Sequence, residues 1–366
     1  MCAPVVVLPQ PVPLSAEPFF RPVTRAKRRF PMSTLRKCLT LVIVLAVAGT
    51  LSVYPSSKAE AAKKARFAHN MPPKPQLLYH AAALTFQNNL RIYTKGELDI
   101  DIFPSSQLGK DKVAAKKVQL GSIQFQIVAS NNITAFDRRL DIFTLPFMFG
   151  SFKGAAKVFN SDIGMTIGEN FRKKSGIRVL GFIATGFRNM MNSKHPILKP
   201  ADLGDLRMRI AKNPIMVATY KALGGSTIGM SPTELFSALS TKTVDGHDGG
   251  SSWAWAQKLY EVQKYLSITR HQLVAGAFIM NDKYFQSLSK KNQRAVLRAA
   301  TDAISWANAY AEENEKEIMK GFARKGLKID TPEIAPFRKA VKVVHQKFAD
   351  KVGGMDLINR ILAMQQ

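Results

Sequence analysis

The segment GDLRMRIAKNP, residues 204–214, contains two arginines at a spacing that suits chemistry on one face of a strand. If its middle is extended, Arg207 and Arg209 point to one side of the sheet, and the apolar residues between and beside them point to the other. These apolar residues are Leu206, Met208 and Ile210. A guanidinium matches a carboxylate in bidentate geometry, and the pair is stronger where water is excluded. The segment therefore favours either a solvated basic face or an anion site.

A third arginine, Arg188, lies in TGFRNMMNS, 21 residues before Arg209. The simpler interpretation for each arginine is a surface position or an ion pair with a local acid such as Asp202 or Asp205. The alternative is that Arg188 and Arg209 face the same ligand.

Other chemistry finds little support in the sequence. The six histidines, none at metal-ligand spacing, are His69, His80, His195, His247, His271 and His345. No HExxH, GxSxG, SxxK or glycine-rich phosphate loop occurs. Asp245 and Asp248 stand three residues apart in a glycine-rich turn, where turn chemistry is the commoner role. We predict no catalytic residue, no metal site and no cofactor.

The N-terminus is predicted to be a secretory leader. After Met32, Arg36 and Lys37 precede an apolar run over 39–53, and an Ala-Glu-Ala cleavage site follows at 59–61. Residues 1–31, rich in Pro and Arg, precede this leader and are expected to be a gene-calling artefact. Both cysteines, Cys2 and Cys38, fall before the cleavage site, so the mature chain is predicted to have no disulfide or thiolate site.

The mature chain is strongly basic, with 45 Lys and Arg against 24 Asp and Glu from residue 62 onward. Such an excess is compatible with nucleic-acid or anionic-membrane binding. The lysines are spread over the whole chain without a basic block, and no zinc-finger or RNA-binding signature occurs. A solvated basic surface is therefore favoured, and we predict no nucleic-acid partner.

Short apolar runs alternate with amphipathic segments, the pattern of an α/β fold. Strands are expected at 65–70, 96–104, 123–130, 177–184, 187–192, 206–210, 226–230, 243–246, 265–270 and 276–280. Helices are expected at 76–93, 110–120, 151–159, 163–175, 214–223, 232–240 and 253–262.

The chain is expected to cross between two lobes near residues 185–187 and to return near 273–276. Ser289 suits the N-cap of a helix that runs to Lys325, and Gly326 suits its C-terminal end. A helix of about 35 residues would be about 50 Å long, more than one lobe covers. We therefore expect it to span both lobes.

Seven motifs occur in a fixed order: FPSSQLG (103–109), GSxxF (121–125), LPFMF (145–149), GFR (186–188), PADLGDLRMRI (200–210), VDG (244–246) and YEVQKYLSITRH (260–271). In these motifs the whole mature chain resembles the periplasmic solute receptors of TRAP transporters, the tripartite ATP-independent periplasmic transporters. The resemblance implies two α/β lobes joined by hinge strands and closing on a ligand, with a long helix across both.

The resemblance also implies ligand contacts. The arginine of the family's LKGLKIRV-like strand, which holds the ligand carboxylate, matches Arg209, and that of its G-x-R motif matches Arg188. Arg207 stands where the family often has Lys and receives no ligand role. Asn70, Ser130 and Asn131 follow strands at ends expected to face the cleft.

After VDG the family commonly continues with a Glu-Asn-like pair, whereas this chain has HDGGSSWAW with Gly249 at the amide position. Asp248 and Trp253 are expected to contact the ligand, with Trp253 or Trp255 filling space against an apolar part of it. This departure concerns the identity of the substrate.

The resulting prediction is a periplasmic receptor, not an enzyme, that binds a small organic acid and delivers it to the TRAP permease subunits of the membrane. Apart from its cleaved leader it is not expected to span the membrane. The predicted parts are 1–61 (extension and signal peptide), 62–186 plus 274–310 (lobe I) and 187–273 plus 311–366 (lobe II). The alternatives are a secreted enzyme on the same scaffold, with Asp248 and His247 as its reactive pair, or a sensory binding domain.

Overall fold

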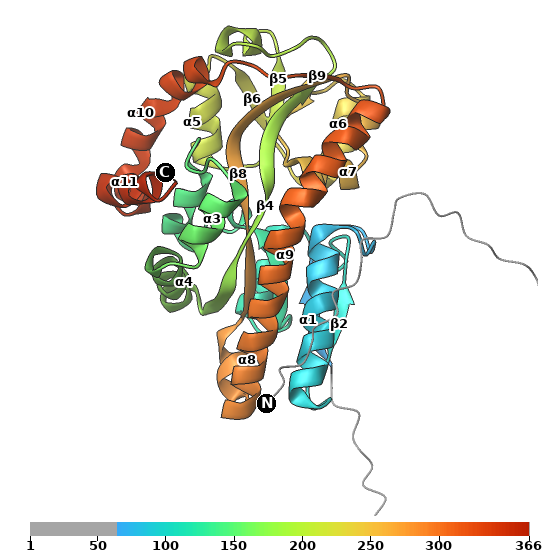
Figure 1. Ribbon diagram of the computed structural model, residues 1–366, viewed down its shortest axis with the longest axis vertical. Coiled ribbons are helices and arrows are strands. Elements are labelled where there is room, and N and C mark those ends of the chain that lie inside the picture. Colours follow the sequence, from blue (N-terminus) through green and yellow to red (C-terminus); the bar gives the residue numbers. More distant parts are fainter. Residues whose placement is uncertain (1–63, 366) are drawn as a thin grey trace, which may run out of the picture. The chain divides into compact units, whose positions relative to one another are not determined.

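The computed structural model describes residues 64–365, and within them the strands form one sheet. The strands are β1 (Ala65–Ala68), β2 (Ile100–Phe103), β3 (Phe125–Ala129), β4 (Ile177–Asn192), β5 (Arg207–Ile210), β6 (Ser226–Gly229), β7 (Gly246–His247), β8 (Tyr265–Asn281) and β9 (Lys328–Asp330). Their order is β2-β1-β3-β8-β4-β7-β5-β6, and β9 pairs with β8 (Figure 1).

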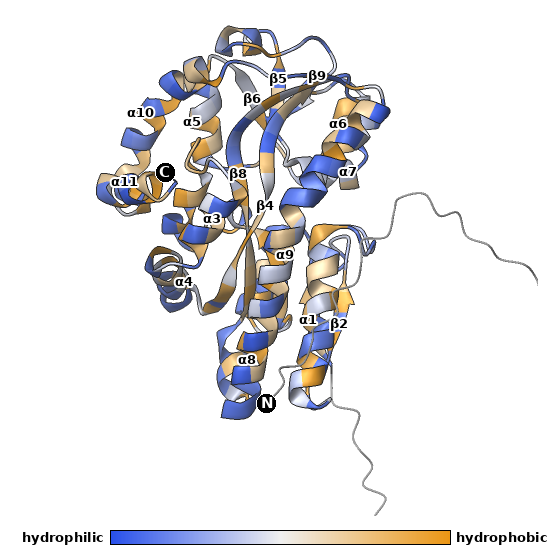
Figure 2. Cartoon of the chain, viewed as in Figure 1, coloured by the Kyte–Doolittle hydropathy of each residue, from blue (hydrophilic) through white to orange (hydrophobic). Residues whose placement is uncertain are grey.

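Helices surround this sheet on the described part of the chain (Figure 1). They are α1 (Leu78–Thr94), α2 (Asp111–Gln119), α3 (Phe152–Phe159), α4 (Asp162–Ser175), α5 (Pro214–Ala222), α6 (Leu235–Ser240), α7 (Ser251–Ala256), α8 (Asp282–Ser287), α9 (Lys290–Arg324), α10 (Ile334–Val352) and α11 (Met355–Ala363). Figure 2 shows polar and apolar residues alternating along α9 and α10, as expected for helices that bury one side.

The sheet has two parallel halves joined by a pair of long antiparallel strands. In one half β1 pairs in parallel with β2 and β3, and in the other β5 pairs in parallel with β6 and β7. Strands β4 and β8, 16 and 17 residues long, pair with each other and link the halves. At about 3.3 Å per residue such strands reach about 50 Å, so the same two strands serve both lobes.

The expected crossing near residues 185–187 coincides with an irregularity in this strand pair. The register of β4 against β8 shifts between Ala184 and Phe187, and Gly186 there has φ +129°, a conformation that side chains disfavour. The hinge strands of the predicted fold class are thus confirmed as two continuous strands, and their pairing is also irregular at Val179/Gly181 and at Arg188/Met190. The position of the crossing between the lobes stays a prediction.

The long helix is also confirmed. Helix α9 has 35 residues, Ser289 Oγ accepts a hydrogen bond from the Asn292 amide at 3.2 Å, and Gly326 follows its end with φ +86°. It packs on α1 and β4 in one half and on α7 in the other. Two of its polar side chains bind the backbone of β4 at the expected crossing. Asn308 Oδ1 accepts a hydrogen bond from the Ala184 amide at 2.7 Å, and Glu315 Oε2 accepts one from the Phe187 amide at 3.1 Å.

The apolar interior forms two clusters. The larger contains the packed rings of Phe67, Phe86, Phe125 and Phe278, whose centroids lie 5.0 to 6.2 Å apart. The smaller lies under α6, α7 and the end of α9 and includes Phe322. The larger cluster also contains Met208 of β5 and Tyr220 of α5, so it runs through both halves of the sheet. Tilted and edge-on ring pairs add to the stability gained by burial of area.

The predicted helix over 253–262 is wrong in its extent. Helix α7 ends at Ala256, Lys258 has φ +55°, and a 3₁₀ turn follows at Leu259–Glu261. The reason is tertiary: Trp255 packs against α9 at Gly321, where an added Cβ would lie 2.7 Å from the indole.

The predicted leader, its cleavage site and both cysteines lie outside the described residues. Among residues 64–365, every helix is too short or too polar to cross a bilayer.

Glu315, beside the expected crossing, should make the free energy of unfolding depend on pH. Burial raises the pKa of its carboxyl from 4.5 to about 7, against the opposing effects of the Phe187 amide and Arg270. Because the folded pKa is the higher one, the stability of the wild-type chain should fall as pH rises from about 4.5 to 7, by about 2 to 3 kcal/mol. In Glu315→Gln, which keeps an acceptor for the amide, this loss should be absent. Urea unfolding at pH 4.5, 6 and 8 measures it.

The exposed neighbour Glu312 supplies the control for this experiment. Glu312→Gln should retain most of the pH dependence of the wild-type chain, because the Glu312 charge is the smallest of the causes that shift the pKa of Glu315. A constant difference between wild type and Glu315→Gln across the range would contradict the assignment.

Candidate ligand-binding site

The polar residues singled out from the sequence gather where the carboxyl ends of the parallel strands of both halves meet. Asn70 follows β1, the segment Ser130–Asn132 follows β3, Arg209 lies near the end of β5, and Asp248 follows β7. Open α/β sheets bind ligands at this edge, and here the two edges face a shared cavity.

The alternation predicted for the segment 204–214 is present, yet the two arginines differ. Met208 and Ile210 are fully buried on the core side of β5. Arg207 has a half-exposed side chain, whereas Arg209 is only 2% exposed. Arg209 is therefore buried on the cleft side of the strand, and Arg207 lies near its outer end.

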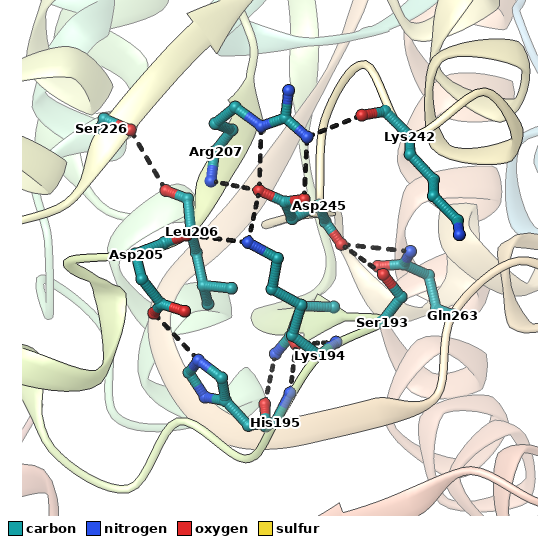
Figure 3. A network of polar contacts seen from close by, with 11 residues as sticks. Ser193, Lys194, His195, Asp205, Leu206, Arg207, Ser226, Lys242, Asp245 and Gln263 are labelled. Carbon is teal, nitrogen blue, oxygen red and sulfur yellow. Dashed lines mark hydrogen bonds and ion pairs between the residues drawn. The ribbon is translucent and has the colours of Figure 1, made fainter.

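Arg207 belongs to a structural network around Asp245, shown in Figure 3. Its backbone amide and Nε donate to Asp245 Oδ2 at 2.9 and 3.1 Å, and its Nη2 donates to Oδ1 at 3.0 Å. Lys194 Nζ lies 3.3 Å from the same carboxylate. The hydrogen bonds from Arg207 lower the pKa of Asp245 to about 2, so this aspartate is a structural partner and not a proton donor.

Arg209 is held by a backbone carbonyl. Its Nε and Nη2 donate to the Met230 carbonyl oxygen, after β6, at 3.1 and 2.6 Å. The guanidinium carbon lies 5.8 Å from the centre of the Trp253 ring. Within the described chain its Nη1 has no hydrogen-bond partner. Burial lowers the pKa of Arg209 to about 10, which still leaves a full positive charge at neutral pH.

Arg188, from β4, is 5% exposed and forms a bridge between loops. Its Nη1 donates to the Asp248 carbonyl oxygen at 2.9 Å and lies 3.4 Å from Asp248 Oδ1, and its Nη2 donates to Asn131 Oδ1 at 3.3 Å. Its Nε is buried without a partner among the described residues. A buried donor without a partner costs free energy, so this side chain is prepared for another acceptor.

A cavity of about 550 Å³, its mouth included, lies between these groups. Its lining includes both guanidinium groups together with apolar and aromatic walls. The lining residues are Asn70, Met71, Tyr79, Ala129, Asn132, Thr185, Arg188, Arg209, Ala211, Pro232, Gly249, Gly250, Ser252, Trp253 and Val274.

A second chamber of about 280 Å³, its mouth included, adjoins the first and shares Asn70, Pro232 and Trp253 with it. It contains Asp111, the first residue of α2, which is 8% exposed. Asp111 Oδ2 accepts from Asn132 Nδ2 at 2.7 Å and from Asn70 Nδ2 at 3.0 Å. Burial raises the pKa of this carboxyl, and the two amide hydrogen bonds oppose the rise.

Four of the seven residues expected to bind ligand line the first cavity: Arg209, Arg188, Asn70 and Trp253. The other three are Ser130, Asn131 and Asp248, which are buried and do not line it. Asn131 and Asp248 instead hold Arg188, so both act on the cavity through that arginine. Trp255, the other tryptophan considered, packs on α9.

Asp111 and Asn132 are site residues that were not predicted from the sequence. Asp111 follows β2 through a loop, and Asn132 directly follows two residues that were singled out. The strand-end rule applied to β1 and β3 also applies to β2, and it would have directed attention to both.

The residues that an enzyme would use are engaged elsewhere. His247 Nδ1 accepts from the Gly249 amide at 2.8 Å, and burial lowers the pKa of its ring to about 3. His247 does not line either of the two chambers, and Asp248 faces Arg188. The arrangement suits binding of an anion by two fixed cations.

Two parallel half-sheets joined by long antiparallel strands, with buried arginines in a cavity between them, define a two-lobe periplasmic binding protein. Residues 67–351 match the family model described as bacterial extracellular solute-binding protein, family 7, and the chain belongs to that family. The family consists of solute-binding receptors.

Among its relatives is the 2,3-diketo-L-gulonate-binding periplasmic protein YiaO of Escherichia coli, 29% identical over 295 residues that cover 81% of this chain and 88% of the relative. A TRAP periplasmic solute-binding protein from Polaromonas with bound D-erythronate superposes with a TM-score of 0.79, 27% identity and coverage of 82% and 99%. One from Sulfurospirillum deleyianum with bound succinate gives a TM-score of 0.76, 25% identity and coverage of 82% and 98%.

Asp245→Asn tests the structural role of the Arg207 network. The lowered pKa of Asp245 means that its stabilising contribution exists above the unfolded value of 3.8 and is lost as pH falls toward about 2. Because Arg207 is half exposed and solvent screens the pair, the loss of unfolding free energy at pH 7 should be about 1 kcal/mol. Chemical denaturation of both proteins at pH 7 and pH 2.5 measures this loss.

Asp205→Asn, at an exposed carboxylate that pairs with His195, is the matched control and should change stability by less than about 0.5 kcal/mol. A deficit in Asp245→Asn that stayed equally large at pH 2.5 would show that the charge is not its cause.

Proposed function

We propose that this chain is a periplasmic receptor that binds a small organic acid between its lobes through Arg209 and Arg188. The observation that carries the proposal is the burial of two guanidinium groups with free donor positions at one cavity. A ligand carboxylate would accept from Arg209 Nη1 and Arg188 Nε, which have no partner within residues 64–365. Desolvated charge pairs of this kind are strong when both partners are hydrogen-bonded.

The lobe boundaries belong to the same proposal: 62–186 plus 274–310 for lobe I and 187–273 plus 311–366 for lobe II. In this division three polar contacts join the lobes around the cavity. Lys110 Nζ lies 2.6 Å from Glu234 Oε1, Asn213 Nδ2 donates to Asp141 Oδ1 at 2.7 Å, and Arg188 donates to Asn131. Helix α11 of lobe II contacts lobe I, where Arg360 Nη2 lies 3.0 Å from Asp162 Oδ2.

Binding would then proceed by closure. A ligand that contacts both lobes favours the closed arrangement by the difference between its affinities for the closed and open forms. The bend would occur at the bulge of β4, where Gly186 and the register shift allow the strands to change direction. In this mechanism Arg188, next to the bulge, senses the ligand at the hinge itself.

Delivery and location follow from the family. We propose that a signal peptide within residues 1–61 directs the chain to the periplasm and that the closed receptor docks on the permease subunits of a TRAP-type transporter. D-Erythronate and succinate are bound by the two similar structures, so a carboxylate is the feature that their ligands share. The enzyme alternative is disfavoured because neither His247 nor Asp248 lines the two chambers and because the family consists of solute-binding receptors.

Arg209→Ala tests the carboxylate site. A thermal-shift screen of mono- and dicarboxylates, keto acids, sugar acids and amino acids identifies the best stabiliser, since a ligand raises the melting temperature by mass action. Titration calorimetry with that acid should then show a loss of at least about 30-fold, or about 2 kcal/mol, in Arg209→Ala. The physical reason is the loss of a charged partner for a buried anion.

Arg207→Ala is the matched control, two residues away on the same strand face and engaged by Asp245. It should lower stability and leave affinity within about threefold, because its guanidinium does not line the cavity. Equal binding by Arg209→Ala and the wild-type chain would refute the proposed function.

A further inference from the structure

The two chambers differ in hydrogen-bonding character. The first has the donor groups of Arg188 and Arg209, and the second has a carboxylate, Asp111. Asn70 lies at the boundary and lines both. Arg209 and Asp111 are close enough for the arginine's charge to act on the Asp111 carboxyl. The second chamber also has groups that can donate, among them Ser106, Lys110 and Thr233, but no guanidinium. A ligand that fills both chambers therefore meets two guanidinium groups at one end and a carboxylate at the other.

The acceptor end has unused capacity. Asp111 Oδ2 is occupied by the two asparagine amides, whereas Asp111 Oδ1 accepts no hydrogen bond from residues 64–365. Asn70 Oδ1 is buried and also lacks a donor within the described chain. The buried Asn70 Oδ1 carries a desolvation cost unless a donor arrives. Two neighbouring acceptors without donors thus stand beside the proposed carboxylate site.

The acceptor end is also rigidly placed. Asn70 and Asn132, from the ends of β1 and β3, hold the carboxylate of α2 by hydrogen bonds of 3.0 and 2.7 Å. Asn132 is itself fixed, because its Oδ1 accepts from Asn131 Nδ2 at 2.8 Å. A carboxylate fixed before binding loses little conformational freedom when a ligand arrives.

We propose that Asp111 is a specificity-determining residue that selects a monocarboxylate bearing hydroxyl groups and rejects a second carboxylate. This inference rests on the proposed function. The ligand's carboxylate faces Arg209 and Arg188, and its hydroxyls donate to Asp111 Oδ1 and Asn70 Oδ1. A site built to receive hydroxyl donors discriminates strongly against analogues that lack them, because its acceptors then stay unpaired.

A second carboxylate at this end would meet a like charge. Lys110 is the cation of the second chamber, and its ammonium is engaged by Glu234 at 2.6 Å. A ligand ammonium is disfavoured for the opposite reason, since it would add a positive charge close to the two buried arginines. A neutral hydroxyl satisfies the acceptors without either conflict.

Three acids of one chain length separate these possibilities: D-erythronate, butanoate and succinate, each with four carbons. The same comparison at six carbons uses D-gluconate, hexanoate and adipate. Calorimetric or competition titration of the wild-type chain should show the hydroxy acid binding at least about 30-fold more tightly than both its matched acids at the length that fits better.

Asp111→Asn reverses the polarity of the end chamber at nearly constant volume. Its carbonyl can accept from Asn70 and Asn132, which turns the new amide donors toward the ligand. The variant should bind the hydroxy acid at least about 10-fold more weakly and the matched dicarboxylate at least as well as the wild-type chain does. Asp101→Asn, at an exposed aspartate of β2 in the same lobe, is the control and should change neither affinity.

The outcomes separate this inference from the function on which it rests. If the wild-type chain binds the matched dicarboxylate or the unsubstituted acid more tightly than the hydroxy acid, the proposed role of Asp111 is wrong. If that binding still depends on Arg209, the proposed receptor function stands. Unchanged selectivity in a folded Asp111→Asn would also overturn the role of Asp111. If no organic acid, in these sets or in the wider screen, binds in an Arg209-dependent way, the proposed function itself fails. The wild-type comparison requires no variant to fold.

Discussion

The cost of burying two guanidinium groups is the constraint on which the rest of this structure depends. A charge in the interior is tolerated only when hydrogen bonds surround it. Arg209 is bound by the Met230 carbonyl, and Arg188 is bound by Asp248 and Asn131. In both cases hydrogen bonds satisfy part of the guanidinium and leave one nitrogen without a partner among the described residues, at a cavity that both arginines line. The apolar clusters, the strand ends and the hinge strands all hold the residues that make these hydrogen bonds in position.

The topology explains how one short cavity collects polar groups from so many parts of the chain. Parallel strands in each half present their carboxyl ends to the same side, and β4 and β8 bring the two sides together. Residues separated by more than a hundred positions, such as Asn70 and Arg209, therefore line one space. Two neighbouring asparagines position the charged groups of the cavity. Asn131 accepts a hydrogen bond from Arg188, and Asn132 donates one to Asp111.

Much of the fold could be predicted from local patterns. Alternation identified β5, and helical periodicity and capping identified α9. The failures are tertiary. The break after α7 depends on the contact of Trp255 with Gly321, on a helix more than sixty residues later.

The site could also be predicted only as far as local patterns reach. Strand alternation places Arg207 and Arg209 on one face, yet only the position of Asp245, 38 residues beyond Arg207, decides that Arg207 is structural. Asp111 was missed because a lysine stands on each side of it, and a charged residue in such a setting is typical of a solvated surface. Its burial arises from Asn70 and Asn132, which approach from other strands.

The connection between the lobes has a mechanical consequence. Ladder hydrogen bonds bind β4 to β8, and α9 is anchored beside them through Asn308 and Glu315, so all three elements pass the same narrow region. Such a joint resists twisting and sideways slip and leaves flexing about a single axis as its softest motion. The ligand-free protein would then explore a narrow arc of orientations, and one opening angle would be enough to describe the difference between its empty and loaded forms.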